Sequence, residues 1–280
     1  MFFIDSHCNI PNVLAKYNLH TTAELDEFIT KTTSTNTPEF AYAGCISVAS
    51  DEESHQPTHA LDASFHTVYG IHPLYCNTAA PTVLETVEQL VSTPKCVALG
   101  ETGLDYHDFP GMNYADRDTQ QRFFVDQLAL AARLHKPVVL HTREADEDTM
   151  RIAKEHIDRD TFLDVHCFTS SVSLATWFCQ EFPHAYIGIA GVVTFANGQN
   201  VADVVRAVPL DRLLVETDAP FLTPVPHRRR PNQPGYVPYI IRRIAEIKQL
   251  PVDRVAQQLF TNTLNMFSLD WVDGALVKRN

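Results

Sequence analysis

Residues that can bind metal ions or move protons follow short apolar runs at several widely separated places in the sequence. They are imidazoles and carboxylates, the side chains that ligate Zn²⁺, Mn²⁺ or Mg²⁺ in proteins. The set consists of His7, Glu101, His141, His166 and Asp218. Each residue alone has an ordinary explanation, such as a hydrogen-bonded histidine or a helix cap. Their repeated position just past a different apolar run instead indicates one shared divalent-metal site.

The apolar runs have the length and composition of strands that are buried on both faces. They are dense in valine, isoleucine and leucine, and the intervals between them are long enough for a helical crossover. The predicted strands are residues 2–5, 42–49, 66–71, 96–100, 137–141, 162–166, 185–189 and 213–216. The segments between and after them carry helix signals: Pro81 at a helix start, Asp118 or Thr119 and Ser170 or Ser171 as caps, and helical patterns at 239–249 and 253–267.

Eight strands that alternate with helices predict a single-domain (β/α)₈ TIM barrel over residues 1–280. The alternative is a doubly wound open sheet, which would normally have a glycine-rich first turn that this sequence lacks. In a barrel the carboxyl ends of all strands meet on one face, where barrel enzymes carry their chemistry. The candidate ligands would therefore surround one axial cavity, beside the long proline-rich loop at 220–238.

Composition narrows the classes of protein that are consistent with the chain. It has 280 residues, 45% of them hydrophobic and 20% charged, which is typical of a globular protein. Its net charge of −12 gives no long-range attraction to nucleic acid or to an anionic membrane, so a polyanionic substrate would need local positive charge such as bound metal. The six cysteines form no C-x-x-C pair and are expected to be buried free thiols. With no signal peptide or transmembrane segment recognised, a cytoplasmic protein is expected.

Six motifs together resemble those of the TatD family of metal-dependent deoxyribonucleases, within the amidohydrolase-like superfamily. They lie at residues 4–8, 70–73, 100–106, 141–143, 166–169 and 216–222, in order along the whole chain. The arginine-rich loop at 228–234 also corresponds, with Gln233 where the family usually has glutamate. The resemblance implies a barrel hydrolase that shortens DNA from the 3′ end, with DNA ends or short single strands as substrate. DNA repair, DNA breakdown during cell death and RNA trimming are all compatible roles.

The resemblance also implies a divalent-metal site with one or two ions, bridged by Glu101. The implied ligands are His7, Asn9 and Asp218 for one ion, and His141 and His166 for the other. Asn9 departs from the His-x-His pattern of many members, and a neutral amide oxygen suits Mg²⁺ better than a softer ion. Mg²⁺ is therefore the expected ion, with Mn²⁺ or Zn²⁺ as alternatives. Two such ions could activate water and clamp a phosphodiester.

Further residues are candidates for proton transfer and for substrate binding. Asp218 could take a proton from the attacking water, and His72 could hydrogen-bond a phosphate oxygen. Arg143 could pair with a phosphate, and Tyr106 could stack on a terminal base. The basic run is Arg228, Arg229 and Arg230, which could grip the nucleic-acid backbone. The expected protein is a monomer with no membrane partner.

Two other functions stay open at this point. Related barrels hydrolyse small amides, lactones or cyclic imides, although those often use a carboxylated lysine on the fourth strand where this chain has Glu101. A catalytically weakened metal-binding homologue is the second alternative, and Asn9 is its support.

Overall fold

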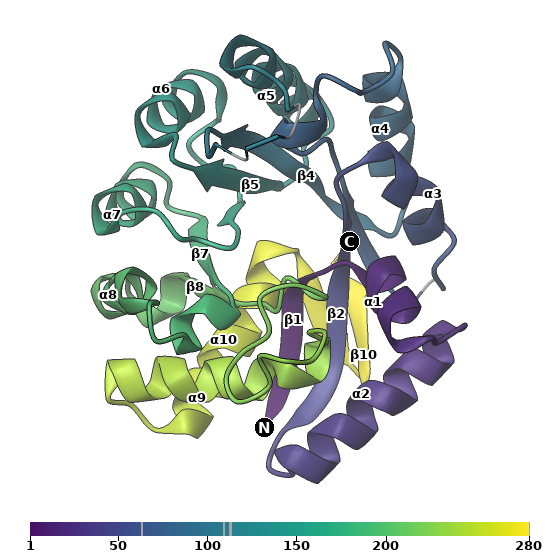
Figure 1. The fold of residues 1–280 in the computed structure, drawn as a ribbon, viewed down its shortest axis with the longest axis vertical. Helices are drawn as coiled ribbons and strands as arrows, with labels where there is room; N and C mark the ends of the chain where they lie inside the picture. Colours follow the sequence, from purple (N-terminus) through teal and green to yellow (C-terminus); the bar gives the residue numbers. More distant parts are fainter. Residues whose placement is uncertain (63, 109, 112–113, 280) are drawn as a thin grey trace.

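Eight parallel strands form one sheet in sequential order, and the sheet curls into a barrel with helices around it (Figure 1). The structure is a computed structural model that describes residues 1–62, 64–108, 110–111 and 114–279. The barrel strands are β1 (Phe2–Cys8), β2 (Ala41–Ala49), β3 (His66–Tyr69), β4 (Cys96–Asp105), β5 (Val138–Arg143), β6 (Leu163–Val165), β7 (Ala185–Ile189) and β8 (Leu213–Val215). The prediction of a (β/α)₈ barrel is confirmed.

The helices cover the outside of the barrel, and their apolar faces pack against the strands. They are α1 (Ile10–Tyr17), α2 (Thr22–Asn36), α3 (Glu52–His59), α4 (Val83–Val91), α5 (Arg117–Arg133), α6 (Asp146–His156), α7 (Val172–Glu181), α8 (Gln199–Ala207), α9 (Val237–Lys248) and α10 (Val252–Met266). A hairpin of β9 (Leu269–Val272) and β10 (Ala275–Lys278) follows α10. No helix in the described ranges combines the length and the apolar character that crossing a bilayer requires.

The seam between β8 and β1 closes the barrel through the residues that follow β8. Cys8 and Ala219 form a parallel bridge, and the Asn9 amide donates to the Ala219 carbonyl at 2.9 Å. Thr217, which also follows β8, donates its amide proton to Asp5 Oδ1 on β1 at 2.8 Å. Because β8 itself is only three residues long, these contacts hold the segment after β8 against β1.

Strand interiors explain why the apolar runs in the sequence are continuous. Every residue of β4 and β7 is buried, since one side faces the barrel axis and the other faces the helices. The cysteines fit the same pattern, because Cys8, Cys45, Cys76 and Cys96 are buried free thiols. Cys167 and Cys179 are also free thiols but are only partly buried, which corrects that part of the prediction.

Strand and helix ends differ in places from the sequence-based prediction. β1 continues to Cys8 and β4 to Asp105, so two of the polar clusters predicted after strands lie within them. Asp116 caps α5 by accepting from the Thr119 amide at 2.8 Å, which corrects the predicted caps at Asp118 and Thr119. Pro81 lies before the N-cap of α4 rather than in its first turn.

Ser171, one of the two predicted caps, does cap α7, and it accepts from the Leu174 amide at 3.1 Å. The helices α1, α2, α3, α6 and α8 and the terminal hairpin have no counterpart among the predicted elements. In α3 the helical signal is weak because the segment is polar and contains Pro57 inside the helix.

Candidate metal centre

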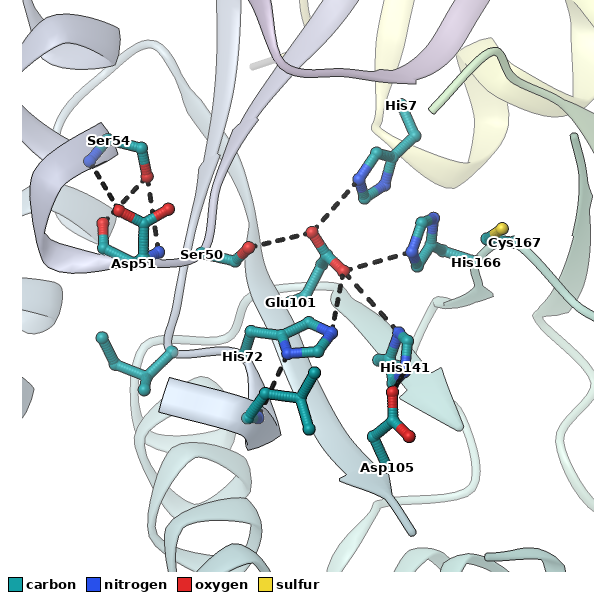
Figure 2. Close-up of polar contacts among 12 residues, drawn as sticks. His7, Ser50, Asp51, Ser54, His72, Glu101, Asp105, His141, His166 and Cys167 are labelled. Carbon is teal, nitrogen blue, oxygen red and sulfur yellow. Dashed lines mark hydrogen bonds and ion pairs between the residues drawn. The ribbon is translucent and has the colours of Figure 1, made fainter. Parts of the chain in front are cut away.

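Glu101 lies at the centre of four histidines on the carboxyl-terminal face of the barrel (Figure 2). Its Oε1 is 3.3 Å from His7 Nε2, and its Oε2 is 3.1 Å from His166 Nε2. His141 Nδ1 and His72 Nε2 approach Oε2 at 3.8 Å and 3.9 Å. The structure thus brings together side chains from β1, β4 and β5 and from the loops after β3 and β6, which are far apart in the sequence.

Irregular strand register directs the central side chains into the cavity. The β4–β5 pairing shifts between Gly100 and Thr102, at the position of Glu101. The β1–β2 pairing shifts between Asp5 and Cys8, around His7. Such bulges occur often beside active sites because they turn a side chain away from its regular direction. Glu101 and His7 therefore both point into the cavity, although the regular two-residue alternation of side chains along a strand would not direct both of them there.

The donor atoms fall into two groups that could each hold a cation. His7, Glu101 and His166 place one ligand atom each within 4.8 Å of one another, and so do His72, Asp105 and His141. His7 Nε2 and His166 Nε2 face the two carboxylate oxygens of Glu101 at 3.3 Å and 3.1 Å, so the ligand atoms of the first group already point toward one another. Imidazole nitrogen and carboxylate oxygen suit a divalent transition ion, so these residues fit a metal.

Electrostatics in the cluster favour an ionised Glu101. Burial alone would raise the pKa of Glu101, but the His166 and His7 rings outweigh it and hold that pKa well below its ordinary value. Burial, reinforced by His166, lowers the pKa of His7. Burial also disfavours a charged His166, yet Glu101 and Glu216 raise the pKa of His166 well above its usual value. A bound cation would replace the proton on this ring.

Three acidic or hydroxylic residues around the cluster were not singled out from the sequence. Asp105 Oδ2 accepts from His141 Nε2 at 3.1 Å and so orients that ring. Ser50 donates to Glu101 Oε1 at 3.0 Å. Asp105 lies in the motif at 100–106, which was the available signal for it, whereas Ser50 carries none.

The third is Glu216, which lies beneath His166 and is fully buried. Its Oε1 is 3.3 Å from His166 Nδ1 and accepts from the Cys167 amide at 2.5 Å. Asp164 is buried nearby, and a Cβ at Gly188 would stand 2.7 Å from Glu216 Oε2 and 3.1 Å from Asp164 Oδ1. Gly188 therefore makes the room in which the Glu216 carboxylate can support His166.

Asp218 lines the same cavity but stands apart from the two tight donor groups. Its backbone is left-handed, with φ of 55°, and its amide donates to the His7 carbonyl at 3.0 Å. Burial raises the pKa of Asp218 to about 8, against the opposing effect of His166. Without a cation this carboxyl therefore holds a proton at neutral pH, and it becomes a proton acceptor once nearby positive charge lowers that pKa.

Asn9 lines the cavity and also begins α1 as its N-cap. Its Oδ1 accepts from the Asn12 amide at 3.3 Å. This is a common use of asparagine at a helix start. The amide oxygen that the sequence assigns to a metal is therefore engaged with the helix in this structure.

His72 presents a hydrogen-bond donor to the centre of the cavity. Its Nδ1 accepts from the Leu74 amide at 3.2 Å, so the proton of the neutral ring lies on Nε2, the atom that faces Glu101. Burial, together with the neighbouring His141 ring, lowers the pKa of His72 to about 3. The ring is consequently neutral at physiological pH, with a defined tautomer.

The cavity above the cluster has a volume of about 590 Å³, and Arg143 is part of its lining. Tyr106 is not: its hydroxyl donates to Asp148 at 2.9 Å, and its ring lies under the Arg117 guanidinium at 4.3 Å. This corrects the placement of Tyr106 beside the substrate, because the loop after β4 turns its ring toward α5 and α6.

The basic run also lies outside the lining of this cavity. Arg228, Arg229 and Arg230 are exposed in the loop after β8. The Arg228 guanidinium stacks 3.6 Å from the Phe195 ring centroid and donates to the Thr223 carbonyl at 3.2 Å. This run can therefore meet only parts of a substrate that extend beyond the cavity.

Comparison with known proteins places this site in a family. The model of the family described as TatD related DNase matches residues 4–268. YcfH of Escherichia coli K12, described as an uncharacterized metal-dependent hydrolase, is 35% identical over 273 residues, covering 96% of this chain and 97% of the relative. A human protein, 3′-5′ RNA nuclease TATDN2, is 31% identical over 282 residues, covering 95% of this chain and 35% of the relative.

Solved structures agree with these sequence matches. The crystal structure of YjjV, a TatD homologue from Escherichia coli K12, superposes with a TM-score of 0.79 at 27% identity, covering 96% of this chain and 98% of the other. A TatD family hydrolase from Entamoeba histolytica shares the fold, with a TM-score of 0.74 at 20% identity over 95% of this chain and 97% of the other. The chain belongs to the TatD family of metal-dependent hydrolases.

Proposed function

We propose that the protein is a metal-dependent nuclease that removes nucleotides from the 3′ ends of single-stranded DNA. The observation that carries the proposal is the convergence of four imidazoles on Glu101 at the floor of an open cavity. Family membership supports hydrolysis, and the name of the human relative supports a nucleic-acid substrate attacked from the 3′ end. That name also makes RNA the second candidate substrate.

The chain's own residues divide between holding cations and handling the substrate. His7, Glu101 and His166 would hold one ion, and His141, which faces Glu101 Oε2 at 3.8 Å, would help to hold a second. When bound, a divalent ion supplies Lewis-acid stabilisation of the phosphate and makes water more acidic. The imidazole-rich donor set suits Mn²⁺ or Zn²⁺, whereas the predicted Mg²⁺ prefers oxygen ligands.

The substrate-handling residues line the wall around these ligands. His72 Nε2–H is positioned to donate to a non-bridging phosphate oxygen, because its Nδ1 is already an acceptor for Leu74. Asp218, when ionised, takes the proton of the attacking water. Arg143 contributes positive charge inside the cavity, and the exposed run at 228–230 meets the backbone farther from the scissile bond.

The test is digestion of short single-stranded DNA and RNA labelled at either end. Metal-stripped protein is incubated with each oligonucleotide while Mg²⁺, Mn²⁺ or Zn²⁺ is added back separately. We expect metal-dependent stepwise shortening from the 3′ end by a monomeric protein, as judged by light scattering. Glu101→Ala should abolish it, whereas Glu155→Ala, which removes an exposed carboxylate on α6, should not.

Failure with every ion, despite metal bound at the site, would refute the nuclease proposal. A panel of small amides and lactones then tests the amidohydrolase alternative. Metal binding without turnover on either panel would support the weakened homologue instead.

A further inference from the structure

Two exposed aromatic side chains stand at the mouth of the metal-site cavity. Phe221 is 58% exposed and Tyr75 is 46% exposed, and both are part of the cavity lining. Tyr75 follows β3 and Phe221 follows β8, so the two rings lie on separate parts of the barrel rim. Aromatic rings that line a cavity are available to contact a ligand that enters it.

Both rings project from backbone that is held in place. The Phe221 amide donates to the Asp218 carbonyl at 2.9 Å, and its own carbonyl accepts from Asn232 Nδ2 at 2.6 Å. Asn232 is fully buried and also donates to the Thr217 carbonyl. The Tyr75 amide donates to the His72 carbonyl at 2.9 Å. The backbone that carries each exposed ring is therefore anchored to residues of the site.

The position of Tyr75 relates it to the phosphate-handling histidine. Its ring centroid lies 5.9 Å from that of His72, whose Nε2 faces Glu101. Phe221 comes three residues after Asp218 in the same turn. A group that stacks on either ring would thus adjoin a phosphate that contacts His72 or Asp218.

Charge around Tyr75 indicates which part of a nucleotide it can accept. Tyr75 also lines a second hollow of about 630 Å³, together with Asp51, Glu52 and Glu53. Three carboxylates would repel a phosphate but not an uncharged base. The lining of the metal-site cavity also includes Arg143, whose positive charge attracts a phosphate. The backbone of the substrate is thus directed away from the Tyr75 side, while a base can lie over its ring.

We propose that Phe221 and Tyr75 are base-stacking platforms for unpaired nucleotides next to the scissile phosphate. The inference rests on the proposed function and names its substrate class: single-stranded ends, bound through the faces of their bases with little sequence preference. A paired base inside a duplex has both faces covered by its neighbours, so it cannot use the platforms. Tyr106, the aromatic that the sequence favoured for stacking, is occupied by Arg117 and Asp148 instead.

The test measures stacking directly with 2-aminopurine, whose fluorescence falls when it stacks. A short single strand carrying it at the 3′ end is titrated with metal-loaded protein in an Asp218→Asn background that does not cleave. Phe221→Ala and Tyr75→Ala should each lose quenching and weaken binding by roughly 5- to 150-fold. Phe221→Tyr and Tyr75→Phe should retain both. Val225→Ala changes an exposed side chain of the same loop that is not part of the cavity lining, and should behave like the parent.

An abasic nucleotide at the 3′ end separates stacking from a general effect on the site. Phe221→Ala should weaken binding of the normal strand but cause no further loss with the abasic strand. Equal losses on both strands, or quenching that persists in both alanine variants, would overturn the inference.

The outcomes also separate this inference from the proposed function. If both alanine variants trim single strands as the wild type does, the stacking role of the two rings is refuted and the proposed nuclease activity stands. Quenching that depends on Phe221 in a protein that cuts no nucleic acid supports the platforms and refutes the nuclease. Neither binding nor cutting of any oligonucleotide refutes both.

Discussion

Glu216→Gln tests whether a buried carboxylate beneath the metal centre sets its affinity. Glu216 Oε1 lies 3.3 Å from His166 Nδ1 and accepts from the Cys167 amide, while no group in the described residues hydrogen-bonds Oε2. Glutamine keeps an acceptor oxygen for Cys167 but removes the negative charge beside the ring. The perturbation therefore reaches His166 without changing any residue that faces the cavity.

The expected loss follows from the role of second-layer partners of metal-binding histidines. Removing such a partner typically lowers metal affinity or activity by about 10- to 100-fold, or about 1.4–2.7 kcal/mol. Glu216→Gln should lie near the lower limit, because the acceptor for Cys167 remains. Glu216→Ala should lie near the upper limit, because it also leaves the buried Cys167 amide without its partner, which costs about 1–3 kcal/mol in stability.

Stability of the metal-free protein should also fall in Glu216→Gln. Glu216 raises the pKa of His166, so its carboxylate stabilises the protonated ring in the folded protein, and glutamine loses that contribution. Burial and the charge of Glu216 also hold the pKa of Asp164 well above its ordinary value, so removing that charge offsets part of the loss. A purely structural role for Glu216 predicts lower stability with an unchanged metal affinity of the folded protein.

The assay is competition for Zn²⁺ or Mn²⁺ against a chromophoric chelator, followed by urea unfolding in excess chelator. Glu155→Gln, at an exposed carboxylate on α6, is the matched control and should match the wild type in both measurements. Wild-type metal affinity in both Glu216 variants would refute the reasoning. So would a metal-free Glu216→Gln that is more stable than the wild type.

Three further predictions concern other parts of the molecule. Asp218→Asn should keep most of its metal in a chelator competition but lose most nuclease turnover, and full turnover would remove Asp218 as the proton acceptor. Asn9→His adds an imidazole to the cavity wall and should tighten Zn²⁺ binding, and an unchanged Zn²⁺ affinity would contradict this. The same change removes the hydrogen bond to the Asn12 amide, so the free energy of unfolding measured in excess chelator should fall by about 1 kcal/mol. Burial lowers the pKa of His66 below 6.5, and its Nε2 hydrogen-bonds the Leu276 carbonyl while no group among the described residues hydrogen-bonds Nδ1. His66 is therefore protonated at a higher pH in the unfolded chain than in the folded protein. The free energy of unfolding consequently falls as the pH drops below 6.5. Urea unfolding of His66→Gln between about pH 7.5 and about pH 5 should show a shallower fall, and an equal slope would exclude His66.

The barrel was predictable because strand composition and spacing are local properties of the chain. Continuous apolar runs reflect burial on both faces, and β7 matches its predicted bounds. The convergence of the candidate ligands was predictable for a related reason, since parallel strands bring their carboxyl ends to one face. His141 and His166 needed only that topology to meet.

Orientation within the site could not be derived in the same way. A bulge at Glu101 decides which way its carboxylate points, and no residue pattern marks that bulge. Glu216 supports His166 only because Gly188 on the intervening strand leaves space for its carboxylate. Such contacts join residues of different strands, and they depend on register rather than on residue type.

The aromatic residues show the same limit most clearly. Tyr106, Tyr75 and Phe221 all follow strands on the catalytic face, and residue type alone makes each a candidate to stack on a base. The loop after β4 directs the Tyr106 hydroxyl to a hydrogen bond with Asp148 on α6, whereas the turn anchored by Asn232 leaves the Phe221 ring exposed. What distinguishes the three is the path of the backbone beyond each strand end. That path depends on contacts between loops, so only the folded structure identifies which rings are free to meet a substrate.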